Sequence, residues 1–304
     1  MLKTIIKRIL IGVATMFVLI TVTFFLVRLM PGSPFEAENV STQMIASLEK
    51  EYGLDQPLFN QYVLYLEKVL HGDLGISYKK NISVVALIAR GMPATMQIGL
   101  LAFLMAAVVG IGLGIWQAST KSGFIRGLLV SYATLGVSLP GFVTALLLIV
   151  VFGAWLQALP VVGLTSPKHY ILPVIAQAFG PIATISRLVK STYSEAMQMD
   201  YVTMARAKGL SKWQISLKHI LKNAILPVIT YFGPAIAFLL TGSFVVESLF
   251  SIPGIGKEFV SAISNRDYTL VLGLSIFIGG VIIIANLLVD ILCAIVDPRI
   301  KFND

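Results

Sequence analysis

The chain has 304 residues, of which 57% are hydrophobic and only 12% are charged, and its mean hydropathy is +0.87. Soluble globular domains carry about 25% charged residues. This composition therefore excludes a soluble globular domain and indicates an integral membrane protein. The net charge of +8 is typical of basic cytoplasmic loops and does not call for a nucleic-acid partner.

Six apolar stretches are long enough to cross a bilayer, at approximately 9–29, 95–117, 128–157, 170–190, 224–249 and 269–296. Lipid offers the backbone no hydrogen bonds, so spans must be helices or closed barrels, and continuous apolar runs favour helices. We therefore expect an all-α integral membrane protein with six transmembrane helices. The first stretch ends in Met30-Pro31-Gly32 without a signal-peptidase pattern, and we interpret it as a retained helix.

The longest connection on the outer side is 31–94, which we expect to be an extracytoplasmic segment. Within it, Thr42–Tyr52 is amphipathic, and Gly53 is placed to end that helix. Pro57 suits the first turn of a second helix that continues through Leu70. We expect both helices to pack over the outer end of a transport path.

Glycine and proline residues oppose straight helices in three of the stretches. The third stretch is too long for one perpendicular span, and Leu139-Pro140-Gly141 is expected to kink or divide it. Gly180-Pro181 and Gly233-Pro234 predict breaks in the fourth and fifth stretches. Such breaks suggest helices that line a path, where neighbouring helices or water satisfy the freed carbonyls, although each could equally be a structural kink.

Polar residues on these interrupted helices are the candidates for lining a path. A hydrogen bond to a neighbouring helix is the alternative for each of them, since serine and threonine make such bonds routinely in membranes. The candidates are Gln177, Thr184, Thr230, Thr241 and Ser243.

The inner connection at 191–223 is the most informative part of the chain. It is basic, helix-prone and longer than two spans need for a simple link, so we interpret it as a docking element for another protein on the cytoplasmic side. Asp200 suits the start of a helix, because its carboxylate can accept hydrogen bonds from free backbone N–H groups. Gly209 permits a tight turn or a close approach by a partner backbone.

The side chains of this connection divide into an apolar face and a basic one. Met204, Ala207 and Leu210 share one helix face through their three-residue spacing. Lys208 and Lys212 could meet acidic residues of the partner or lie near anionic lipid.

Lysine and arginine predict that both termini lie inside the cell. With the N-terminus in the cytoplasm, the inner segments hold 14 of the 23 basic residues. This bias toward short inner loops follows the positive-inside rule.

Motifs for catalysis, metal binding and ion coupling are missing from the sequence. Gly254-Ile255-Gly256-Lys257 lacks the spacing of a phosphate-binding loop, and neither a zinc-protease motif nor a nucleophile elbow occurs. The single cysteine, Cys293, lies in an apolar run and excludes an intrachain disulfide. Asp290 is the only ionisable residue that we expect to be buried in a span, in a structural role, and this argues against an ion-coupled carrier.

Several motifs occur here in the order found in the B-type permeases of oligopeptide and dipeptide ABC importers, which the chain resembles over nearly its whole length. These motifs include Pro31-Gly32-Ser33-Pro34, Gly53-Leu54-Asp55-Gln56-Pro57-Leu58, Gly72-Asp73-Leu74-Gly75-Ile76-Ser77, Pro93-Ala94-Thr95, Asp200-Tyr201-Val202, Ala205-Arg206-Ala207-Lys208-Gly209-Leu210-Ser211, Ile252-Pro253-Gly254-Ile255-Gly256 and Asp297-Pro298-Arg299. The 191–223 loop departs from the general EAA pattern, since Gly209 and Pro227 are farther apart, but the peptide subgroup shares that spacing.

The resemblance implies a type I ABC importer permease fold in a bacterial cytoplasmic membrane. The permease would be non-catalytic and without a cofactor of its own, paired with a homologous second permease. It would take peptide from an extracytoplasmic binding protein and dock two ATPase subunits that bind ATP and Mg²⁺. The resemblance assigns ATPase coupling to Asp200, Tyr201, Met204, Ala205, Arg206, Ala207, Lys208, Gly209, Leu210 and Ser211.

Two alternatives stay open at this point. The same family includes importers of nickel, glutathione and haem, although a nickel site in this chain would need several His or Cys side chains that it lacks. From a different class, the chain could be an autonomous channel or ion-coupled carrier, which would transport its substrate without ATPase partners.

Overall fold

The computed structural model describes residues 2–29 and 53–296, with a single isolated β-bridge between Ile76 and Ser83 beside the helices. Five of the described helical segments are long and apolar enough to cross a membrane, and a bent helix pair makes a sixth candidate. An all-α membrane fold is therefore confirmed. The expected helix at Thr42–Tyr52 lies outside the described residues.

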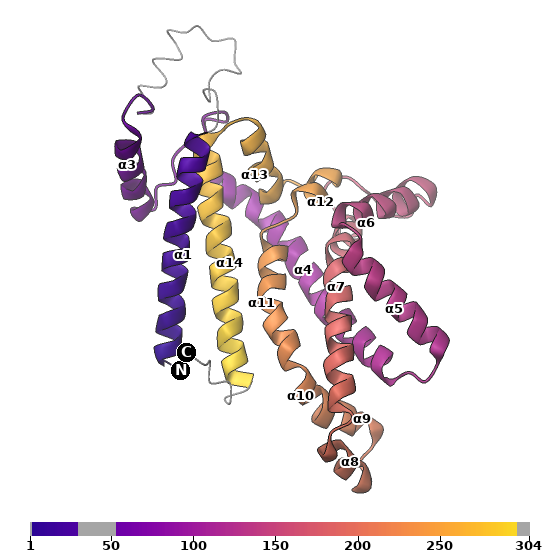
Figure 1. Cartoon of the computed structure of the whole chain (residues 1–304). Coiled ribbons are helices and arrows are strands. Elements are labelled where there is room, and N and C mark those ends of the chain that lie inside the picture. Colours follow the sequence, from indigo (N-terminus) through magenta and orange to yellow (C-terminus); the bar gives the residue numbers. More distant parts are fainter. Residues whose placement is uncertain (1, 30–52, 297–304) are drawn as a thin grey trace.

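The helices that correspond to the six apolar stretches form the body of the molecule (Figure 1). They are α1 (Leu2–Arg28), α4 (Val84–Ser119), α5 (Gly123–Ser138) with α6 (Gly141–Leu148) and the π-helix η1 (Ile149–Trp155), α7 (Lys168–Ala196), α11 (Leu226–Leu240) with α12 (Phe244–Leu249), and α14 (Tyr268–Val296).

Shorter helices gather at the two ends of this body. α3 (Leu58–Leu70) and α13 (Ile255–Ser264) lie at one end, as Figure 1 shows. At the other end lie α8 (Asp200–Ala207), α9 (Lys212–Gln214), the π-helix η2 (Ile215–Leu221) and α10 (Lys222–Ala224), together with the start of α1 and the end of α14.

The second span begins earlier than its hydropathy predicts. α4 starts at Val84, because the Oγ of Ser83 accepts a hydrogen bond from the Ala86 N–H at 3.3 Å and so caps the helix. Pro93 then falls inside the helix and does not end it. A proline removes a single N–H donor, and such losses are tolerated in membrane helices whose neighbours satisfy the freed carbonyl.

The third stretch divides where the sequence predicts it to. Leu139 has extended backbone angles, φ −79° and ψ 126°, because the ring of Pro140 disfavours helical geometry in the residue before it. The helices on either side are bent by 112°. The 16 residues of α5 reach about 24 Å along the helix axis. The 128–157 stretch is therefore a broken one, as expected, in which α6 and η1 run at a steep angle to α5.

Breaks at Gly180-Pro181 and Gly233-Pro234 are not found. Pro181 lies inside the continuous helix α7, and Pro234 lies inside α11. The fifth stretch is interrupted instead after Leu240, where Gly242 has a φ of +82°. Only glycine adopts this left-handed region without a steric cost, so the chain changes direction there and α12 begins at Phe244.

Small residues allow the central helices to pack closely. A Cβ atom at Gly110 of α4 would lie 2.8 Å from the Cβ of Ile185 on α7. A Cβ at Gly99 would lie 2.8 Å from the carbonyl carbon of Leu239 on α11. In lipid, where burial from water does not drive association, such close approach supplies the van der Waals contact that holds helices together.

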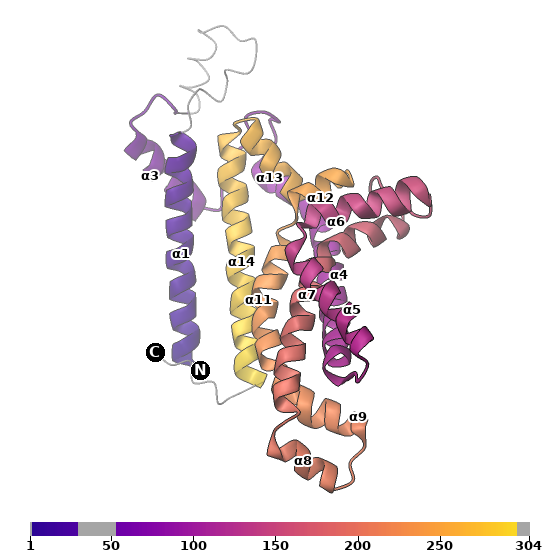
Figure 2. The ribbon, with the colours of Figure 1, turned by 45° about the vertical axis from the view of Figure 1, so that its right-hand side comes forward.

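α1 is a peripheral helix that packs against α14 (Figures 1 and 2). Near its start, Arg8 forms an ion pair with Asp290 of α14, with 3.0 Å between Nη1 and Oδ2. This pair explains the acidic residue in the last span and confirms a structural role for it. At the other end, Phe24 of α1 stacks on Tyr65 of α3, with 5.4 Å between ring centroids, so α3 lies on the flank of α1.

Candidate functional site

The connection at 191–223 folds into a helical hairpin that projects beyond the inner end of α7 (Figure 2). Gly209, with a φ of +71°, makes the turn that ends α8. The Leu210 N–H donates to the carbonyl of Ala205 at 3.3 Å, which closes the C-terminus of that helix. We call residues 200–221 the coupling hairpin.

The second arm of the coupling hairpin starts with a capping box. The Gln214 N–H donates to the Ser211 Oγ at 3.3 Å, and the Ser211 N–H donates to the Gln214 Oε1 at 3.2 Å. These reciprocal bonds satisfy two backbone donors that would otherwise lack a partner. The hairpin therefore has a defined shape set by its own sequence.

Asp200 does not cap α8. The capping position is Met199, and its side chain makes no capping hydrogen bond, while Asp200 is the first helical residue. The carboxylate still lies in the first turn, where a negative charge is favoured by the helix dipole. The prediction of a stabilising acid at the helix start holds, but the capping geometry was wrong by one residue.

The two faces of α8 have different environments. Val202 and Ala205 are buried against the rest of the chain, so Ala205 is the assigned coupling residue that cannot contact a docked protein directly. Met204 is 60% exposed, and it shares the opposite face with exposed Ala207. Trp213 on α9 is 72% exposed. An apolar surface is thus exposed to solvent at the tip of a basic loop.

The remaining assigned coupling residues are all at least partly accessible on this hairpin. Tyr201 is half-buried, and the others are exposed: Asp200, Arg206, Lys208, Gly209, Leu210 and Ser211.

A direct hydrogen bond joins the coupling hairpin to α7. The hydroxyl of Tyr193, a buried residue of α7, donates to the Ser216 Oγ of η2 at 2.6 Å. Buried Ile215 and Ile220 of η2 belong to the same apolar core as Val189 of α7. The hairpin is therefore held by a hydrogen bond and by buried apolar contacts against a helix that crosses the whole body.

A cavity of about 270 Å³ lies between α6, α7 and the α11–α12 break. It is lined by two of the five path candidates, Gln177 and Ser243. Two buried polar atoms on its wall, the Gln177 Oε1 and the Thr144 Oγ1, have no hydrogen-bond partner among the described residues. Thr144 was missed from the sequence, where it is one threonine in an apolar run.

The other three path candidates do not line this cavity. Each hydroxyl donates to a carbonyl of its own helix at 3.1 Å, Thr184 to Gly180, Thr230 to Leu226 and Thr241 to Phe238. These bonds satisfy the hydroxyls locally. A part for these three residues in a path stays a prediction.

Glu247 is buried in the fifth stretch, so the expectation that Asp290 is the only buried ionisable residue was wrong. The Thr95 hydroxyl donates to the Glu247 Oε1 at 2.8 Å, and the Lys257 N–H donates to the Glu247 Oε2 at 2.8 Å. The Ile255 N–H donates in turn to Thr95 Oγ1 at 2.9 Å. This cluster joins α4, α12 and α13 next to the cavity.

Replacing Glu247 with glutamine should lower the thermal stability of the purified chain. An amide retains one acceptor oxygen where the carboxyl group has two, so a buried donor loses its acceptor at a cost of about 1–3 kcal/mol. The matched control is Glu258→Gln on α13, whose carboxylate pairs with Lys80 at the surface. Unfolding followed by tryptophan fluorescence in detergent checks this, and equal midpoints for both variants would contradict it.

No group of three His, Cys, Asp or Glu side chains within the described residues could hold a metal ion. Cys293 is buried, with its Sγ 3.6 Å from the Thr230 Oγ1.

Residues 110–302 match the family described as the binding-protein-dependent transport system inner membrane component, and residues 1–99 match the N-terminal region of such membrane components. The chain belongs to this family.

Two curated relatives match along their whole length. The dipeptide transport system permease protein DppB of Bacillus subtilis (strain 168) is 42% identical over 305 residues, which are 100% of this chain and 99% of the relative. The oligopeptide transport system permease protein OppB of Haemophilus influenzae is 43% identical over 306 residues, 99% of this chain and 100% of the relative.

A solved structure of the MetNI methionine ABC transporter in an inward-facing conformation shares the fold. It matches with a TM-score of 0.57 and 16% identity, over 70% of this chain and 97% of that one. The type I ABC importer permease fold is therefore confirmed.

Proposed function

We propose that this chain is a permease subunit of an ATP-driven importer of short peptides. It forms half of the translocation pathway and couples to ATPase subunits through the loop at 191–223. The observation that carries the proposal is the coupling hairpin, whose exposed apolar face is joined to α7 by buried contacts. Peptide as the substrate rests on the DppB and OppB relatives.

The partners follow from this assignment. A homologous second permease supplies the other half of the pathway, and two ATPase subunits bind ATP and Mg²⁺ beneath the hairpins. An extracytoplasmic binding protein delivers the peptide. The start of α1 and the end of α14 lie at the same end of the molecule as the hairpin, which supports both termini being cytoplasmic in a bacterial plasma membrane (Figure 1).

Alternating access is the mechanism that this geometry favours. Closure of the ATPases on ATP moves the two coupling hairpins toward each other, and the Tyr193–Ser216 bond carries that displacement into α7. Because α7 lines the cavity that holds Gln177, its tilt changes which side of the membrane the cavity opens to. Hydrolysis and product release reverse the movement.

Weak substrate selection in the pathway is consistent with the cavity. Its free polar atoms are an amide oxygen and a hydroxyl, which can pair with any peptide backbone, while the other lining residues are apolar or glycine and proline apart from Ser243. Selection of peptide length then rests with the binding protein. The DppB and OppB relatives do not favour a nickel, glutathione or haem importer, nor an autonomous channel or ion-coupled carrier.

Deletion of the gene should abolish ATP-dependent uptake of labelled short peptides. Uptake is measured alongside that of labelled nickel, with and without depletion of ATP, and a plasmid copy of the gene should restore it. Loss of nickel uptake with peptide uptake intact would keep the permease architecture and overturn the substrate. Peptide uptake that needs the gene but survives ATP depletion would point to an autonomous carrier.

A further inference from the structure

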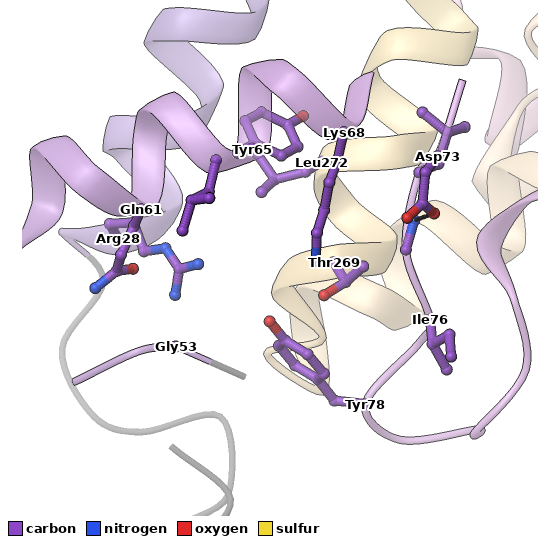
Figure 3. A pocket seen from close by; sticks show the side chains of 13 residues that line it. Arg28, Gly53, Gln61, Tyr65, Lys68, Asp73, Ile76, Tyr78, Thr269 and Leu272 are labelled. Atoms are coloured by element: carbon purple, nitrogen blue, oxygen red, sulfur yellow. Dashed lines mark hydrogen bonds between the residues drawn. The ribbon is translucent and has the colours of Figure 1, made fainter. Parts of the chain in front are cut away.

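A second cavity, of about 340 Å³, lies at the end of the molecule opposite the coupling hairpin. Its walls come from the last turn of α1, from Gly53, from α3, from the 73–78 loop and from the first two turns of α14. Figure 3 shows Lys68 and Tyr78 entering this space from opposite sides, with Arg28 and Gln61 along another edge. Neither the coupling hairpin nor the pathway cavity involves these residues.

Three buried polar atoms around this cavity have no hydrogen-bond partner in the part of the chain that the structure describes. They are the Arg28 Nε, the Tyr65 hydroxyl and the Gln61 Oε1. Leaving a buried polar group without a partner is costly, so three such atoms around one cavity point to a ligand that completes the site. Burial raises the pKa of Tyr65 above its ordinary value, which keeps its hydroxyl protonated and able to donate.

The cavity also carries two cations, Arg28 and Lys68, against one carboxylate, Asp73. Arg28 is held over the rings of Phe24 and Tyr268, with its Cζ 5.4 and 5.8 Å from their centroids. Neither Arg28 nor Lys68 forms an ion pair with a carboxylate of the described residues. The guanidinium, the ammonium and the Tyr65 hydroxyl are the donors that a phosphate group requires.

The same cavity also holds hydrogen-bond acceptors, which require a donor group on the ligand. The Gln61 amide is fixed because its Nε2 donates to the carbonyls of Leu54 and Gln56 at 3.0 and 2.7 Å. Its Oε1 is therefore an acceptor that no described residue satisfies. The Asp73 carboxylate, which accepts from the Gly75 N–H at 2.8 Å, adds a second acceptor on the cavity wall.

We propose that this cavity binds a glycerophospholipid head group, with its phosphodiester among Arg28, Lys68 and Tyr65 and a hydroxyl or ammonium donor toward Gln61 and Asp73. The outer surface of α1 beside the cavity favours a lipid over free phosphate. Leu26 and Leu29 are 61% and 73% exposed there, which suits acyl chains that continue down the helix. The site anchors the peripheral helix α1 and α3 to α14, independently of the transported substrate.

Native mass spectrometry of the full-length chain in detergent tests this proposal. The chain is mixed with phosphatidylglycerol, with phosphatidylcholine, or with inorganic phosphate alone. Phosphatidylglycerol should be retained by the unchanged chain and at least tenfold less by Arg28→Gln/Lys68→Gln, since the double variant loses two charge-assisted contacts to the phosphodiester. Arg90→Gln, which removes an exposed cation of α4 outside the cavity, should retain the lipid fully.

Each other outcome contradicts a defined part of the proposal. Equal retention by the double variant would overturn the site. Phosphatidylcholine, which has the phosphodiester without a donor, should be retained less, and equal retention would overturn the role of Gln61 and Asp73. Binding of inorganic phosphate alone, without lipid, would overturn the lipid assignment. Arg28→Lys is the conservative variant, because it keeps the positive charge. An unchanged elution volume in size-exclusion chromatography shows that a variant is folded, so that a loss of lipid retention does not come from misfolding.

Discussion

Met204→Asp should insert into the membrane at normal levels but lose its ATPase subunits and its peptide uptake. The Met204 side chain is 60% exposed at the surface of α8, so the variant should fold with a change of about 0.5 kcal/mol or less. In the assembled importer the same side chain would enter an apolar groove. An aspartate buried there without a partner costs several kcal/mol, enough to abolish the complex.

Met199→Asp is the matched control for this experiment. Met199 is 52% exposed, and its replacement is the same methionine-to-aspartate change in the same loop. It lies, however, at the capping position before α8. An aspartate there accepts a backbone hydrogen bond and should stabilise the hairpin by about 1 kcal/mol. ATPase co-purification and uptake are measured for both variants. If the Met204→Asp variant still co-purifies with its ATPase subunits, the assignment of this face of α8 to docking is wrong.

Gly209→Asp extends the same test to the turn. An added side chain at Gly209 meets no atom within 4 Å, so its effect within the chain comes only from the positive φ, which aspartate tolerates better than most residues. Gly209→Asn has the same shape and the same tolerance without the charge. Gly209→Asp should lose its ATPase, and Gly209→Asn should retain more of it, because only the former brings a charge to the interface.

Hydropathy and charge predicted much of this architecture because both act locally along the chain. The first, fourth and last stretches appear as α1, α7 and α14, and the turn at Leu139-Pro140 follows from the geometry of two adjacent residues. Helical spacing alone predicted that Met204 and Ala207 share one face of α8, but the placement of Leu210 on that face was wrong, since the helix ends before the turn at Gly209. Each of these features is encoded within one or two turns of sequence.

The errors concern features that depend on distant residues. Proline inside α7 and α11 looked like a break because a soluble helix would break there, whereas packed membrane helices satisfy the freed carbonyls. The burial of Glu247 depends on Thr95, 152 residues earlier in the chain. Gln177 and Thr144 come together only once α6 packs on α7. No local pattern predicts such meetings.

Gly99→Leu should prevent α4 and α11 from packing and should remove most of the folded protein. A Cβ at Gly99 would overlap the carbonyl oxygen of Leu239 and lie 3.2 Å from the Leu240 Cα. Those atoms belong to the backbone, so no side-chain rotation relieves the clash. Overpacking costs about 1–3 kcal/mol, which lowers the ratio of folded to unfolded chain by roughly 5–150-fold.

Gly112→Leu on the same helix provides the matched control for Gly99→Leu. An added Cβ there meets no atom within 4 Å, and leucine favours a helix over glycine by up to about 1 kcal/mol. The two variants thus make the same chemical change 13 residues apart in α4, one against backbone and one in open space. The yield of monodisperse protein after size-exclusion chromatography should fall only for Gly99→Leu. Equal yields would mean that the α4–α11 crossing can open to admit a side chain, and that the close approach of these helices does not limit the stability of the permease.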